Sequence, residues 1–157
     1  QLDSEIISDA PSSGTYSALD LAHNIHSGST QVGTACAVKT DGDIVCWGND
    51  DHDVVSDAPS GSYVDVGVSN GDGCAISSSG SIRCWGSDAG YIWDEPSGSD
   101  YRSIQLDTFS SGACAHDDYG YITCWGSSHY NELIDLCETE EEPGADYFGC
   151  DFHDAEY

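Results

Sequence analysis

The stretch that decides the fold of this chain is ACAVKTDGDIVCWG, at residues 35–48. It returns as GCAISSSGSIRCWG at 73–86 and as ACAHDDYGYITCWG at 113–126. Each copy places apolar residues on both sides of a short, glycine-containing turn, which is typical of an antiparallel β-hairpin. We therefore expect three hairpins in which the turn glycine takes a positive φ angle, namely Gly42, Gly80 and Gly120.

The hairpin register brings the two cysteines of each copy opposite one another. When Cys36 faces Cys46, Val38 faces Ile44 and a loop of residues 40–42 closes the turn. Opposed residues of a non-hydrogen-bonded antiparallel pair lie about 4.5 Å apart between Cα atoms, which is close enough for a disulfide. The sequence therefore predicts one disulfide in each hairpin and a fourth from the two remaining cysteines. The pairs are Cys36 with Cys46, Cys74 with Cys84, Cys114 with Cys124, and Cys137 with Cys150.

Zinc coordination is the competing interpretation of these eight cysteines. Zinc sites usually take ligands from close pairs such as Cys-x-x-Cys, and the sequence contains no such pair. Disulfides form and persist outside the reducing cytosol. We therefore expect the protein to be secreted or displayed at the cell surface.

The charge of the chain excludes several classes of partner. The 157 residues include 29 Asp and Glu against 3 Lys and Arg, a formal charge of -26. A nucleic-acid-binding surface needs clustered Lys and Arg, so nucleic acid is excluded as a partner. No run of 18 apolar residues exists, so we expect no membrane insertion. The acidity suits salty or calcium-containing surroundings, and the composition does not choose between them.

Each hairpin ends a longer repeated unit. The tryptophans that end successive units are 38 and 40 residues apart. Each hairpin is preceded by a proline, a glycine, a tyrosine and an alternating apolar stretch. That alternation predicts a further strand per unit. We expect the repeated aromatic side chains to pack between units, although the tryptophans also suggest a sugar-stacking set. These residues are Trp47, Trp85, Trp125, Tyr16, Tyr63 and Tyr101.

Over roughly residues 8–136, the ordered Pro, Gly, Tyr, strand, Cys-Ala, turn and Cys-Trp-Gly resemble the regulator-of-chromosome-condensation type of propeller repeat, in its cysteine-bearing secreted version. The resemblance implies an all-β fold of three propeller-blade-like antiparallel repeats over residues 11–136. Family members close a ring of about seven blades, so three blades stay open or are completed by neighbouring copies. The family's Gly-Gln-Leu-Gly stretch after Trp-Gly is only faintly echoed, by YNELI at 130–134.

The segments that flank the repeats have separate expectations. Residues 1–10 resemble the end of a unit, with Ile6 and Ile7 parallel to Val54 and Val55, and we expect a strand that docks on a neighbouring copy or on the chain's own last unit. Residues 137–157 form an acidic, disulfide-closed loop and a tail. Within the first unit, HNIHSGSTQV at 23–32 is an insertion, and we expect a loop there.

Candidate sites are few. The oxygen-rich stretch NDDHDVVSD offers a candidate calcium site, although it lacks the closing Glu of a regular calcium loop and also fits a solvated acidic turn. Its carboxylates are those of Asp50, Asp51, Asp53 and Asp57. Trp93, with Tyr91 beside it, lies outside the repeat pattern and is the candidate surface contact.

The sequence carries no catalytic motif such as Gly-x-Ser-x-Gly, a phosphate loop or a zincin helix, so we expect no enzyme. The favoured hypothesis is a non-catalytic extracellular structural protein that self-assembles into a fibre, ring or coat. The alternative is a secreted module that binds a protein or a glycan. Neither hypothesis requires a cofactor.

Overall fold

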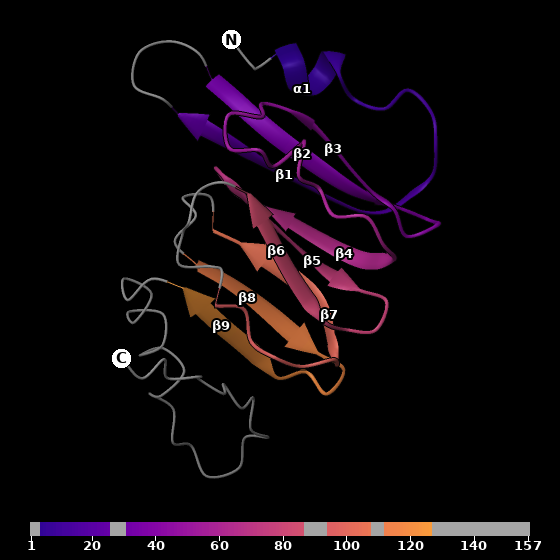
Figure 1. The fold of residues 1–157 in the computed structure, drawn as a ribbon, viewed down its shortest axis with the longest axis vertical. Coiled ribbons are helices and arrows are strands. Elements are labelled where there is room, and N and C mark those ends of the chain that lie inside the picture. Colours follow the sequence, from indigo (N-terminus) through magenta and orange to yellow (C-terminus); the bar gives the residue numbers. More distant parts are fainter. Residues whose placement is uncertain (1–3, 26–30, 87–93, 108–111, 127–157) are drawn as a thin grey trace.

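The computed structural model describes residues 4–25, 31–86, 94–107 and 112–126. Three antiparallel sheets of three strands each follow one another along the long axis of the molecule (Figure 1). We call them blades 1, 2 and 3. Their strands are β1 (Tyr16–Ile25), β2 (Gln31–Lys39) and β3 (Ile44–Gly48), then β4 (Tyr63–Val68), β5 (Asp72–Ser77) and β6 (Ile82–Gly86), and finally β7 (Tyr101–Leu106), β8 (Gly112–Asp117) and β9 (Ile122–Gly126). No helix in this described part is long and apolar enough to cross a membrane.

The hairpin register is the predicted one. Cys36 pairs with Cys46 and Val38 with Ile44, and the other two hairpins repeat this register. All three hairpins carry a disulfide, with Cα atoms 4.1, 4.0 and 4.0 Å apart. The turn glycines have φ angles of 95°, 86° and 88°, as expected. The all-β, three-blade prediction is therefore confirmed, and the described sheets do not close into a ring.

The repeated Trp-Gly pair has a backbone explanation. Gly48, Gly86 and Gly126 have φ angles of 98°, 124° and 130°, a region that side-chain-bearing residues rarely adopt. A Cβ on Gly48 would lie 2.3 Å from the Gly33 carbonyl oxygen, and one on Gly86 equally close to that of Gly71. Glycine is required here because the end of the third strand turns sharply against the chain that enters the second.

Successive side chains point to opposite sides of a strand, and in blade 2 both sides are apolar. In blade 2 one face, which we call the disulfide face, carries Cys74, Ile76 and Ile82, and it packs on blade 3. The other, which we call the Trp face, packs on blade 1 and carries Val66, Val68, Ala75 and Trp85. The disulfide face of one blade therefore covers the Trp face of the next, and two cores result.

Residues 1–10 were expected to contain a strand, and this was wrong. Ser4–Ser8 form a short helix, α1, which lies on the first blade rather than the last (Figure 1). The Trp47 indole Nε1 donates to the Ile6 carbonyl oxygen at 2.9 Å, as Trp85 Nε1 donates to the Val54 oxygen at 2.9 Å. The predicted parallel between Ile6 and Val54 is therefore confirmed, because the indole needs only a carbonyl acceptor and not a strand.

The insertion in the first unit is also more regular than expected. Strands β1 and β2 continue as a ladder through the pairs His23↔Gly33, Asn24↔Val32 and Ile25↔Gln31. The expected loop of residues 23–32 is therefore an extension of a hairpin on both sides of residues 26–30, which lie outside the described part. The alternation of this stretch was too short to predict a strand.

Candidate functional site

One aspartate links blade 1 to blade 2 and another links blade 2 to blade 3, and sequence analysis missed both. Asp20 Oδ2 accepts a hydrogen bond from the Val68 amide at 2.9 Å, and Asp65 Oδ2 accepts one from the Ile104 amide at 2.9 Å. Strands β4 and β7 are each at the edge of their sheet, so both carboxylates satisfy edge amides that no strand pairs. The two aspartates occupy different strand positions, so the repeat gave no signal for them. The one sequence feature that could have identified them is an acidic residue within an otherwise apolar strand.

The hairpin turns provide a second link between blades. The Tyr63 amide donates to the Gly42 carbonyl oxygen at 2.9 Å, and the Tyr101 amide donates to the Gly80 oxygen at 3.1 Å. A Cβ on Gly80 would lie 1.9 Å from the Ser99 oxygen. The turn of blades 1 and 2 is therefore enclosed by the start of the following blade.

The predicted aromatic packing divides between the interior and the ends. Trp85 and Tyr63 are buried between blades 1 and 2, and Trp125 and Tyr101 are partly buried between blades 2 and 3. Trp47 and Tyr16, by contrast, were expected between blades and are not there. Trp47 packs on the helix α1, and the Tyr16 hydroxyl donates to the nearby Ser13 carbonyl oxygen. The reason is that no described blade lies on the Trp face of blade 1.

The Trp face of blade 1 is consequently exposed where the other blades are buried. Leu19 and Leu21 on β1 are 60% and 58% exposed. Their partners on β2 show that they match Val66 and Val68 of β4, which are each 2% exposed. Helix α1 covers the Trp47 side of this face and leaves the two leucines open. We call this surface, Leu19 and Leu21 on β1, the leucine face.

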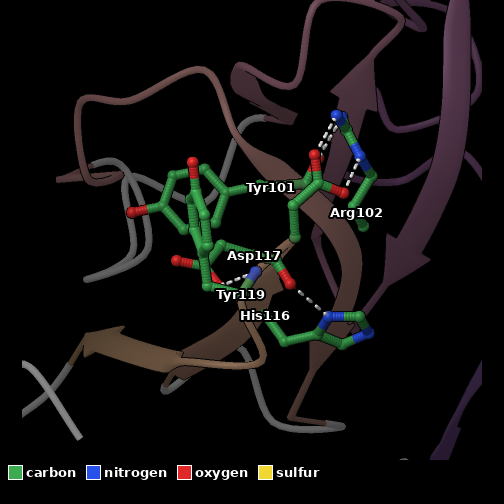
Figure 2. Close-up of polar contacts among 6 residues, drawn as sticks. Tyr101, Arg102, His116, Asp117 and Tyr119 are labelled. Atoms are coloured by element: carbon green, nitrogen blue, oxygen red, sulfur yellow. Dashed lines mark hydrogen bonds and ion pairs between the residues drawn. The ribbon is translucent and has the colours of Figure 1, made fainter. Parts of the chain in front are cut away.

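The turn at the other end is supported from within. Asp117 Oδ1 accepts hydrogen bonds from the Tyr119 and Tyr121 amides at 2.8 and 3.0 Å. Arg102 donates to both carboxylate oxygens of Asp118, at 2.5 Å each (Figure 2). The hydrogen bond to Asp118 raises the pKa of the Arg102 guanidinium, which stays charged at any physiological pH. The β8–β9 turn is therefore ordered by side chains of blade 3 itself, from the turn and from β7.

The acidic stretch does not gather into a calcium site in the described part of the chain. Asp50 Oδ1 accepts hydrogen bonds from the Val55 and Ser56 amides at 2.7 and 3.1 Å, so it closes a turn. Asp53 has a φ of 58° within that turn. Among the described residues no three His, Cys, Asp or Glu side chains come together as metal ligands. The structure thus places Asp50, Asp51, Asp53 and Asp57 in a turn without converging their carboxylates.

Several sequence candidates lie outside the described residues. They are the fourth cysteine pair, Cys137 with Cys150, the acidic loop and tail at 137–157, and the surface-contact pair Tyr91 and Trp93. These remain predictions. Within the described part, the candidate surfaces are therefore the leucine face and the β8–β9 turn.

No protein-family model and no curated protein matches this sequence. Solved structures do. The CRINKLY WD40 ectodomain of the Arabidopsis thaliana receptor kinase ACR4 superposes with a TM-score of 0.55 at 17% identity, covering 72% of this chain and 42% of that one. The entire ectodomain of the Physcomitrella patens receptor kinase CR4 gives a TM-score of 0.46 at 18% identity, covering 62% and 30%. This chain thus spans less than half the length of either ectodomain. The first likeness identifies the fold as that of β-propeller blades.

Proposed function

We propose that this chain is a non-catalytic extracellular protein that assembles with further copies of itself through the faces of its blades. One observation carries the proposal. The leucine face is open, whereas the matching residues of blade 2 are buried by a neighbouring blade. The matching face of blade 2 forms part of a core. We therefore expect the apolar face of blade 1 to be covered by a partner.

Charge favours the same surface. The chain has a formal charge of -26, so two copies repel one another over most of their surfaces. Leu19 and Leu21 carry no charge, and the next residue on the same side of β1 is the exposed His23. Asp20, between the two leucines, is turned toward the Val68 amide of blade 2. Copies therefore meet there with the least repulsion. Salt screens the remainder, with a Debye length of about 8 Å at physiological ionic strength.

The extracellular location is supported by the three hairpin disulfides, since such bonds persist in oxidising compartments. The proposal also assigns the repeats to the regulator-of-chromosome-condensation type, because the Cys-Ala to Cys-Trp-Gly hairpin occurs three times with one register. It invokes no enzyme activity, no cofactor, no nucleic acid and no membrane insertion. Calcium enters only as a condition of the experiment below.

A second candidate function is a secreted module that binds a protein or a glycan. The fold likeness to a receptor-kinase ectodomain favours it, because such a domain faces the outside of a cell. The exposed Tyr119 and Tyr121 on the β8–β9 turn suit that function, since tyrosine combines an apolar ring with a polar tip. In this case the chain acts as a monomer.

Sedimentation velocity and negative-stain microscopy of the unreduced protein separate the two candidates. The measurements are made at about 0.15 M and about 1 M salt, each with calcium or with a chelator. We expect assemblies that grow more abundant as salt screens the acidic surface. A monomer under all four conditions would contradict self-assembly and favour the binding module. Assembly only with calcium would support the NDDHDVVSD stretch as a calcium site.

A further inference from the structure

The two ends of the blade array are not complementary. Continuous head-to-tail growth would place the disulfide face of blade 3 on the leucine face of a second copy, as blades 1 and 2 already pack. In blades 1 and 2 that disulfide face has Val38 and Ile76 at one matching position, and both are fully buried. Blade 3 has His116 at this position, and its side chain is exposed.

Blade 3 also lacks the carboxylate that links one blade to the next. The two positions that hold Asp20 in blade 1 and Asp65 in blade 2 are occupied by Gln105 and Ser103 in blade 3. The Gln105 side chain donates to the neighbouring Ile104 carbonyl oxygen instead. A blade added after blade 3 would therefore receive no aspartate for its edge amides.

The β8–β9 turn of blade 3 also differs from the turns that a following blade encloses. Gly42 and Gly80 are buried by the start of the next blade, whereas the space around the missing Cβ of Gly120 is empty to 4 Å. Asp117 and the Arg102 to Asp118 pair hold this turn from within (Figure 2). Terminal repeats of stacked arrays commonly carry such a polar outer surface. Blade 3 has the features of a cap.

We infer that two copies pair through their leucine faces about a two-fold axis, so that assembly closes at a dimer instead of growing into a filament. This inference rests on the proposed function. The leucine face is the one open blade face of the described residues that keeps the apolar composition of the buried interfaces. Its best match in a second copy is therefore the same face, and a self-complementary patch gives an isologous, closed contact.

The mass of the assembly in solution tests this geometry, measured for single substitutions at the two ends. Leu21→Asp and Leu19→Asp each raise the dimer dissociation constant roughly 30-fold or more, since a two-fold contact carries every substitution twice. Ile122→Asp, at the outer face of blade 3, leaves the constant unchanged. Val64→Asp is the matched control, because Val64 is an exposed aliphatic residue of β4 away from both ends. Near-native circular dichroism of each variant verifies that it is folded.

The possible results are distinct. A wild-type dimer that only the leucine substitutions dissociate supports the two-fold contact. Assemblies larger than a dimer, or equal sensitivity to Leu21→Asp and Ile122→Asp, show head-to-tail packing and overturn this inference while the proposed self-assembly stands. A dimer whose dissociation constant does not change with the leucine substitutions also overturns the inference. A wild-type monomer overturns both.

Discussion

Blade 2 and blade 1 carry the same motif, yet one is enclosed and the other is half open. Blade 2 has a blade on each side, so Val66, Val68 and Trp85 are buried. Blade 1 has a blade on one side and helix α1 on part of the other, which leaves Leu19 and Leu21 exposed. The comparison teaches that two matching apolar faces of a stacked repeat differ in burial when only one of them has a neighbouring blade.

The largest difference in stability is expected between variants that replace Trp85 and Trp47. Trp85→Ala removes a buried ring from the core between blades 1 and 2 and should lower the free energy of unfolding by about 3–5 kcal/mol. Trp47→Ala removes a half-buried ring that packs on α1, so it should cost less than half as much. Urea denaturation followed by far-ultraviolet circular dichroism measures both. Equal losses would mean that α1 covers Trp47 as completely as a blade covers Trp85.

The next largest effect concerns the disulfides of an enclosed and an outer blade. Each hairpin disulfide spans a sequence separation of 10, so removing either should cost about 2.5–3 kcal/mol through the entropy of the unfolded chain. Cys74→Ala with Cys84→Ala also empties space in the core between blades 2 and 3, whereas Cys114 and Cys124 lie outside that core and are only partly buried. We therefore expect the blade 2 pair to cost more. Unfolding midpoints measured without reductant compare the two double variants. A larger loss of stability for the blade 3 pair would contradict this prediction.

Matched aliphatic positions give a smaller effect. Val66→Ala removes two buried methyl groups, which should cost about 1.5–2 kcal/mol. Leu19→Ala alters a side chain that is 60% exposed, and the loss should stay within about 0.5 kcal/mol when the protein is dilute and monomeric. Thermal and chemical unfolding at low concentration measure the two values. If Leu19→Ala costs as much as Val66→Ala, the leucine face is covered within the monomer.

The smallest effect is expected from the carboxylate that links blades 2 and 3. Asp65→Ala leaves the Ile104 amide without its acceptor and should cost about 1 kcal/mol. Asp65→Asn removes the same charge but keeps an acceptor oxygen, so it should cost less and serves as the control. Hydrogen exchange of the Ile104 amide reports the contact directly. Unchanged protection in Asp65→Ala would contradict the proposed link.

Much of the hairpin geometry was open to prediction, whereas the contacts between blades were not. The disulfide of Cys36 with Cys46 follows from a register fixed by ten residues of chain, so no distant group was needed. The hydrogen bond from the Val68 amide to Asp20 joins residues 48 apart in sequence, and no repeat position predicts it. The carboxylates of the NDDHDVVSD stretch looked like calcium ligands because sequence does not show that Asp50 accepts hydrogen bonds from the Val55 and Ser56 amides.

The sequence by itself determined the three hairpins, their disulfides and the glycines of their turns, because alternation, cysteine spacing and positive φ angles are local properties. Only the tertiary structure decided that residues 4–8 form a helix on Trp47, that Asp20 and Asp65 reach the next blade, and that Leu19 and Leu21 stay uncovered. The physical reason is that burial depends on what lies on the other side of a face. Blades 1 and 2 encode matching apolar faces, and their place in the array decides which of these faces meets a neighbour.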